Sequence, residues 1–356
     1  MRALAWRATL VGVVVASQGC HRPAARASGG DAAPTLPAAA PSGTPDPTAT
    51  LFGGERGLDH VGIAVKNLEE ATHTYHDVLG FNRPTEGKLP NGLRNVNYYF
   101  ADSTYLETLV YWDREKAPWV ASFTDKHSGG LFAVLSTFSP ETASRFLSTR
   151  SINVGKTFSG TIQTAGQDAM PDEQWKTFFL PDGTLPGNPL YFISYKRAPR
   201  DEFLKKLEDP RARKVLSHKN TALGLHAVWF AVPDLVAASR AYESIGLPRG
   251  KAFADPALGA DGQIFGAGAG EVWLLAPHGD GSKVAAFLAE RGGPGIMGVT
   301  IEAGSVAQAA RVIGQGTGTS IATYDGLFGP SLRVAPELTH GVWMEFAHRR
   351  SPATSR

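Results

Sequence analysis

The 356-residue sequence predicts an α+β fold built from four copies of one strand–helix–three-strand (βαβββ) module. The segment at residues 57–81, GLDHVGIAVKNLEEATHTYHDVLGF, has the pattern of a strand followed by a helix. Similar segments begin near Gly129, Gly224 and Gly295, and each is followed by shorter apolar segments. Because a segment order that recurs along a chain is typical of repeated structural units, we expect four modules in tandem.

The first module sets the pattern. Its opening strand alternates between two faces, one bearing His60, Gly62 and Ala64 and the other bearing Val61, Ile63 and Val65. A helix follows, with apolar residues at helical spacing up to Val78, and it is expected to end at Gly80. The segments VNYYFAD and TYLETLVYW predict the last strands of the module.

The other modules repeat this order with weaker identity. The second has GLFAVLSTFSPETASRFLSTRSI, then EQWKTFFLPDG and NPLYFISYK as later strands. The third has GLHAVWFAVPDLVAASRAYESIGL, the segment most similar to the first module, then GQIFGAG and EVWLLAP. The fourth has GIMGVTIEAGSVAQAARVIG, then SLRVAPELTHGVWMEFAHR.

Residues 1–20 resemble a signal peptide, with a short basic region, the apolar run ATLVGVVVAS and then the only cysteine, Cys20. A lone cysteine behind such a run resembles the lipobox of bacterial lipoproteins, which implies lipidation of Cys20 and anchoring in the cell envelope, on the periplasmic side or at the outer membrane. Secretion with cleavage after Ser17 is the alternative. Residues 21–50, rich in Ala and Pro, predict a disordered tether.

The remaining chain is long enough for two domains with hydrophobic cores. We expect one domain at residues 51–199 and a second at 223–350, joined by a helical linker at 200–222 and followed by a disordered tail at 351–356. Basic and acidic residues nearly balance, 35 against 33, and no basic patch suggests nucleic acid as a partner. A single cysteine excludes a disulfide within the chain.

The motifs resemble the vicinal oxygen chelate (VOC) superfamily, which includes glyoxalase I, methylmalonyl-CoA epimerase, extradiol dioxygenases and the fosfomycin and bleomycin resistance proteins. LDHVGIAV, TYLETLVYW and NPLYFISYK carry the resemblance to its glyoxalase-like domains, and APELTHGVWMEF resembles the last strand pair of the epimerases. The resemblance implies that modules pair into cupped half-barrels. It also implies that each module offers a metal ligand from its first strand and another from its last strand.

Carried over to this sequence, the resemblance gives four metal ligands, which are His60, Glu107, His226 and Glu345. Glu107 and Glu345 are also the candidate catalytic residues for proton transfer. A glutamate in the middle of an aromatic strand is costly to bury unless a partner such as a metal compensates its charge. The metal would be a divalent ion of unknown identity, and a cup without any metal is the alternative.

The remaining ligand positions carry Phe132, Tyr191, Trp273 and Met297, none of which is a credible ligand. In the first module, the small residues beside His60 are expected to leave space for a bound molecule. In the third module, Val228 and Phe230 are expected to share the face of His226, so that this cup would be tighter.

Pairing of the modules decides which ligands meet. Short connections between modules one and two and between three and four favour sequential pairing, which gives His60 with Glu107 and His226 with Glu345. The alternative pairs module one with four and module two with three, and would bring His60, Glu107 and Glu345 together.

Two functions remain open. In the first, the protein is an exported enzyme-like member of the superfamily that acts on a small oxygen-rich substrate, with metal-dependent lyase or isomerase chemistry. In the second, it is a non-catalytic lipoprotein that sequesters a small molecule in apolar cups lined by Phe132, Tyr191, Trp273 and Phe230. A weaker third possibility is an envelope protein whose sheets serve only protein contacts.

Overall fold

The computed structural model describes residues 50–82, 85–164, 172–187, 190–210 and 216–348. The predicted signal peptide with Cys20, nearly all of the predicted tether and the predicted tail lie outside these residues. Within them, no helix is long and apolar enough to cross a membrane.

Four βαβββ modules are present, as the sequence predicts, and in the described residues their strands belong to one mixed sheet of 17 strands. The first module comprises β1 (Gly57–Ala64), α1 (Leu68–His73), the π-helical turn η1 (Thr74–Val78), β2 (Thr85–Lys88), β3 (Leu93–Tyr99) and β4 (Tyr105–Tyr111). After α2 (Pro118–Thr124), the second module comprises β5 (Gly129–Ser136), α3 (Pro140–Ser148), β6 (Phe158–Gly160), β7 (Gln163–Thr164), β8 (Trp175–Phe179) and β9 (Leu190–Tyr195).

Helix α4 (Arg197–Glu208) follows the second module, so the segment between the two halves begins with a helix. The third module comprises β10 (Ala222–Ala231), α6 (Leu235–Ser244), β11 (Arg249–Asp255), β12 (Ala260–Ala267) and β13 (Gly270–Pro277). After α7 (Lys283–Arg291), the fourth module comprises β14 (Gly295–Ala303), α8 (Val306–Thr317), β15 (Thr323–Gly326), β16 (Gly329–Val334), the 3-10 turn η2 (Pro336–Leu338) and β17 (Trp343–Ala347).

The helix after each first strand begins at a polar capping residue. The caps are Asn67, Ser139, Asp234 and Ser305, and the side chain of each accepts hydrogen bonds from backbone N–H groups in the first turn. These bonds satisfy donors that the helix leaves unpaired at its start. The same local rule therefore turns the chain from strand to helix in all four modules.

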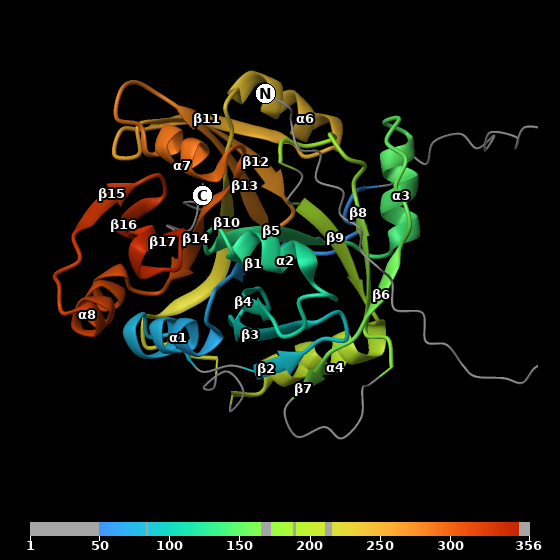
Figure 1. Ribbon diagram of the computed structural model, residues 1–356, viewed down its shortest axis with the longest axis horizontal. Coiled ribbons are helices and arrows are strands. Elements are labelled where there is room, and N and C mark those ends of the chain that lie inside the picture. Colours follow the sequence, from blue (N-terminus) through green and yellow to red (C-terminus); the bar gives the residue numbers. More distant parts are fainter. Residues whose placement is uncertain (1–49, 83–84, 165–171, 188–189, 211–215, 349–356) are drawn as a thin grey trace, which may run out of the picture.

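Consecutive modules pair through their first strands. β1 runs antiparallel to β5, and β10 runs antiparallel to β14. Each first strand also pairs in parallel with the last strand of its own module, as β1 does with β4. Figure 1 shows these four first strands at the centre, with the modules arranged around them. The sequential pairing expected from the short connections is the one formed.

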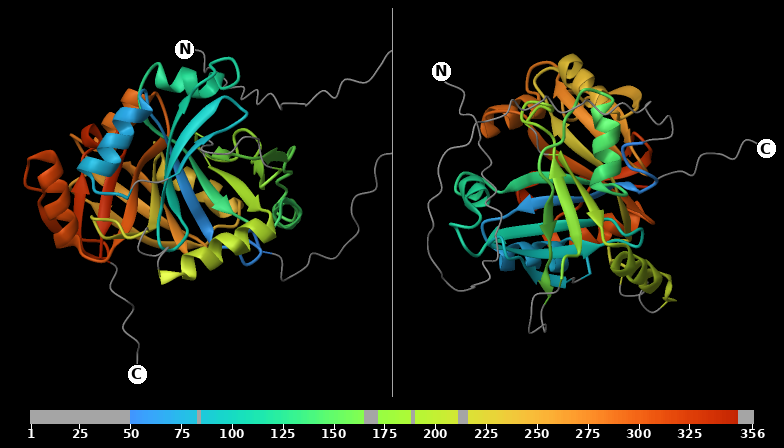
Figure 2. Two further views of the ribbon diagram at one scale, coloured as in Figure 1. Left: turned by 90° about the horizontal axis from the view of Figure 1, so that it is seen from below. Right: turned by 90° about the vertical axis from the view of Figure 1, so that its right-hand side faces the viewer.

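We call the curved sheet of modules one and two the first cup, and that of modules three and four the second cup. The two views of Figure 2 show them side by side. An isolated bridge joins Gly57 to Gly268, and Ile296 of β14 pairs with Gly130 of β5. The largest hydrophobic core contains buried residues from all four modules, so the halves share a core. The proposed domain boundaries at 199 and 223 stay a prediction.

Candidate functional site

His60 and Glu107 face each other on the inner side of the first cup. They come from the paired strands β1 and β4, where Gly62 stands opposite Glu107. His60 Nε2 lies 3.6 Å from Glu107 Oε2. Both residues are buried, with exposed fractions of 3% and 7%. The pair predicted from the sequence is therefore brought together.

Asp59 and Tyr195 fix the orientation of His60. Asp59 is the extra residue of a β-bulge in β1, because Leu58 and His60 stand opposite consecutive residues of β5. The bulge lets Asp59 Oδ1 lie 2.7 Å from His60 Nδ1, and Tyr195 of β9 donates a 2.8 Å hydrogen bond to the same oxygen. A carboxylate at Nδ1 favours the tautomer that keeps Nε2 as an acceptor or ligand.

Asn95 holds the other side of the pair. Its Nδ2 donates a 2.8 Å hydrogen bond to Glu107 Oε1, so Oε2 is the oxygen directed at His60. Burial raises the pKa of Glu107 above its usual range, and the nearby His60 and the Asn95 hydrogen bond offset only part of this effect. A carboxylate with a raised pKa accepts a proton more readily than an ordinary glutamate does.

Aromatic rings enclose the pair. Tyr105 stacks on the His60 ring at a centroid distance of 4.2 Å, and Phe132 lies edge-on to it at 6.1 Å. The ring of Phe132 contacts Tyr191 at 5.1 Å, and burial raises the pKa of Tyr191 so that its hydroxyl stays neutral. Phe132 and Tyr191, predicted as positions without a ligand, are thus a wall of the cup.

The space expected beside His60 is not empty. A Cβ added at Gly62 would lie 2.3 Å from the ring of Phe132, so this ring covers the glycine. The expectation that the small residues leave room for a bound molecule was therefore wrong at Gly62. The sequence shows a small residue but not which side chain from the neighbouring strand packs over it.

The second cup places its histidine differently from the prediction. The strand register puts Ala227 of β10 where His60 stands in β1, and puts His226 where Asp59 stands. His226 is the extra residue of a bulge, as Asp59 is. The assignment of His226 to the ligand position of its strand was wrong by one residue. A gapless alignment of GLHAVWFAV with GLDHVGIAV gives the observed equivalence.

The same shift corrects the lining of the second cup. Val228 and Phe230 belong to the shared core, whereas Ala227, Trp229 and Ala231 belong to the apolar cluster of the second cup. Trp229 occupies the position of Gly62, and across the strand pair Gly298 occupies the position of Phe132. A Cβ at Gly298 would lie 2.4 Å from Trp229. Bulky and small residues are therefore exchanged between the two cups.

Neighbouring side chains compensate the negative charge of Glu345. It is 2% exposed and accepts hydrogen bonds from Thr300 at 3.0 Å, from Arg333 at 3.3 Å and from the hydroxyl of Tyr324. Arg333 also donates to Asp255 at 2.7 Å and 3.4 Å. The guanidinium thus supplies the positive charge that a metal would otherwise supply.

The predicted pairing of His226 with Glu345 is not formed among the described residues. His226 Nε2 instead lies 3.5 Å from Oε2 of Glu271, a residue that the sequence reasoning missed. Of the ligand-position residues predicted for this cup, only Glu345 keeps its place, and Arg333 already compensates its charge. Glu345 is therefore excluded as a metal ligand, and the metal pair predicted for the second cup does not form.

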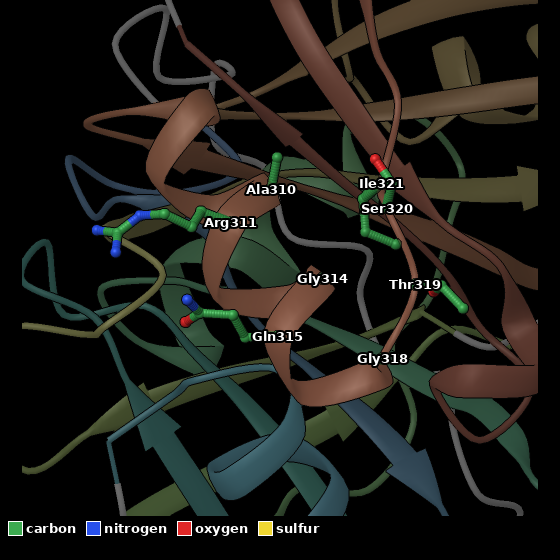
Figure 3. Close-up of a pocket in the computed structure, with 8 residues that line it drawn as sticks. All are labelled: Ala310, Arg311, Gly314, Gln315, Gly318, Thr319, Ser320 and Ile321. Carbon is green, nitrogen blue, oxygen red and sulfur yellow. The ribbon is translucent and has the colours of Figure 1, made fainter.

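Other histidines and a surface hollow lie outside the cups. His73 pairs with Asp77, and His278 with Asp261, both on the exposed surface. His340 lies at a turn with φ of 56° and contacts Thr74. Figure 3 shows a hollow lined by residues of α8 and by residues 318–321, with no histidine or carboxylate among its lining residues.

Sequence reasoning missed the groups that orient the first-cup pair. Asp59 stands next to His60 in the motif LDHV, and this adjacency was a usable signal, because a carboxylate beside a histidine often fixes its tautomer. Asn95 and Tyr195 gave no such signal. They reach the site only because β3 pairs with β4 and β9 pairs with β5.

The comparisons with known proteins agree with this architecture. The family model described as a glyoxalase-like domain matches residues 58–246, just over half of the chain. A mutant 4-hydroxymandelate synthase from Streptomyces coelicolor is similar at 14% identity and TM-score 0.56, over 84% of this chain and 95% of that one. A hypothetical protein from Staphylococcus aureus is similar at 11% identity and TM-score 0.55, over 82% and 98%.

A shorter match is methylmalonyl-CoA epimerase from Mycobacterium tuberculosis, with 22% identity and TM-score 0.33 over 37% of this chain and 91% of that one. No curated protein matches significantly. At these identities the structural likeness concerns the fold alone.

Proposed function

Because the chain belongs to the glyoxalase-like domain family of the VOC superfamily, we propose that its first cup binds a small oxygen-bearing substrate and transfers a proton on it, as a lyase or isomerase does. The observation that supports this proposal best is the buried pair of His60 and Glu107, oriented from opposite sides by Asp59 and Asn95. Such support is typical of a working site rather than of residues packed for stability alone.

A divalent metal ion fits these two residues. A ligand nitrogen and a ligand oxygen each bind such an ion at about 2.0–2.2 Å, so atoms 3.6 Å apart can share one ion. His60 Nε2 and Glu107 Oε2 would hold it, and the ion would supply positive charge to a developing enolate-like oxygen. No third His, Cys, Asp or Glu is placed to bind the same ion within the described parts of the chain, so substrate oxygens would complete the coordination.

The protein's own side chains would transfer the proton, orient His60 and exclude water. Glu107 would accept a proton from the substrate carbon and return it. Asp59 and Tyr195 would keep His60 in one tautomer during this transfer. The aromatic wall at Phe132 and Tyr191 would exclude water and contact the apolar part of the substrate.

Metal analysis of the chain, purified without chelator or histidine tag, tests this proposal. We expect near-stoichiometric metal in the wild type and in the His226→Ala control, and its loss in a His60→Ala, Glu107→Ala double variant. Metal that is retained in the double variant would contradict the site. A metal-containing wild type would then be screened for proton exchange at carbon on small carbonyl substrates.

Sequestration of a small molecule is the second candidate function. It is favoured because the described residues offer two candidate metal ligands here, His60 and Glu107, within an aromatic wall. Absence of metal from both proteins, with the fold intact, would favour it. For either function, we propose export by the segment at residues 1–20 and attachment through lipidated Cys20, with residues 21–50 as a tether. Mass spectrometry of the mature N-terminus tests this proposal.

A further inference from the structure

The second cup contains a buried histidine nitrogen that makes no hydrogen bond and has one carboxylate, that of Glu271, 3.5 Å away. His226 is 5% exposed, and its Nε2 has no hydrogen bond to any described residue. Most buried polar groups are hydrogen-bonded, because an unpaired one loses its contact with water and gains nothing. A nitrogen at this depth without a hydrogen bond has the capacity to bond a further group.

The carboxylate of Glu271 determines which hydrogen-bonding groups a molecule bound at His226 must carry. Its Oε2 lies 3.5 Å from His226 Nε2 and accepts a 2.7 Å hydrogen bond from Trp273 Nε1, which fixes the carboxylate in place. A carboxylate this close favours the tautomer with the proton on Nε2. The pair therefore presents one N–H donor beside one carboxylate acceptor.

A hairpin tip covers this pair. Leu327 and Phe328 form the two-residue turn between β15 and β16. The ring of Phe328 lies edge-on to His226 at 4.9 Å and tilted to Trp273 at 5.7 Å. Lys251 Nζ lies 5.6 Å from the same ring, which adds a cation–π contact. A short two-residue turn that is only partly buried can move without disturbing the shared core.

We propose that the second cup is a binding site for a flat, neutral molecule that carries an adjacent hydrogen-bond acceptor and donor, such as an aromatic carboxamide. Its carbonyl oxygen accepts from His226 Nε2, and its N–H group donates to Glu271. Its ring takes the place of Phe328 against Trp273. Glu271 disfavours an anionic ligand at this position.

This site is separate from the one under "Proposed function", and it needs no metal. The second-cup glutamate at a ligand position, Glu345, is already paired with Arg333, and Ala227 stands where the first cup has His60. The protein would then have a first cup that carries out proton transfer and a second cup that binds a ligand without reaction.

Benzamide is the probe for this site, titrated into the full chain by calorimetry and ligand-detected NMR. We expect saturable binding to the wild type, weaker binding of benzoate, and a loss of affinity of about tenfold in His226→Ala from the missing hydrogen bond. Phe328→Ala, which removes the covering ring, should bind benzamide more tightly. The exposed His278→Ala variant is the matched control and should bind as the wild type does.

Three results would overturn the proposal. Benzamide could bind His226→Ala as well as it binds the wild type. It could fail to bind both the wild type and Phe328→Ala. It could lose its affinity in His60→Ala rather than in His226→Ala, which would place the probe in the first cup.

Discussion

The ion network around Arg333 gives a quantitative prediction for stability. The side chain of Arg333 is 11% exposed, and those of its partners Asp255 and Glu345 are 16% and 3% exposed. Removal of one member of a buried ion pair leaves an uncompensated charge and costs about 3–5 kcal/mol. The guanidinium also lies 5.3 Å from the ring of Trp229. Arg333→Met keeps the aliphatic contacts and removes the charge together with its hydrogen bonds to Asp255 and Glu345.

We expect Arg333→Met to lower the free energy of unfolding by about 3–5 kcal/mol, measured by urea titration followed by circular dichroism. The control is Arg94→Met, which breaks a pair with Glu86 whose side chains are 36% and 46% exposed. A surface pair of this kind contributes at most about 1 kcal/mol. Adding Glu345→Gln to Arg333→Met should recover part of the loss, because it removes the uncompensated charge.

If Arg333→Met costs no more than Arg94→Met, then Arg333 does not neutralise Glu345 in the folded protein. The second cup would then have an available carboxylate, and its exclusion from metal binding would be wrong. A double variant less stable than Arg333→Met alone would contradict the same reasoning.

Three further predictions concern the first cup and the joint between the cups. In protein freed of metal with a chelator, Glu107→Gln should raise the free energy of unfolding at pH 7 by about 1 kcal/mol, because the raised pKa makes the ionised carboxylate unfavourable in the folded state. The gain should vanish towards pH 4, where the carboxyl group is protonated, as parallel urea titrations would show. Asp59→Asn should weaken metal affinity about 10–100-fold in a competition assay with a chromogenic chelator, without changing the circular dichroism spectrum. Gly57→Ala should destabilise the protein by more than about 2 kcal/mol in thermal unfolding, because its Cβ would lie 2.2 Å from the carbonyl oxygen of residue 267. The control is Gly54→Ala, which has a similar positive φ and nothing within 4 Å of the added Cβ, and it should cost only about 1–2 kcal/mol.

The fold could be predicted because its signals are local. Alternation in the first strands, helical spacing after them and caps such as Asn67 and Ser305 recur at matching places along the chain. The pair of His60 and Glu107 could be predicted for a similar reason, since both lie in one module whose first and last strands pair in register.

The rest of the site depends on contacts between modules, which a single sequence does not specify. Tyr195 reaches Asp59 from the last strand of another module, and Arg333 reaches Glu345 from a neighbouring strand. The position of His226 was misjudged because a histidine near a strand start was matched by residue type. Counting from the preceding glycine would have given the correct register.

The exchange of bulky and small residues between the cups limits how one cup could have evolved into the other. Phe132 covers Gly62 in the first cup, and Trp229 covers Gly298 in the second, with no room for a side chain at either glycine. A stepwise route must therefore lose one ring before it gains the other. An intermediate on that route would have a small residue on both strands, and therefore a more open cup floor than either half has now.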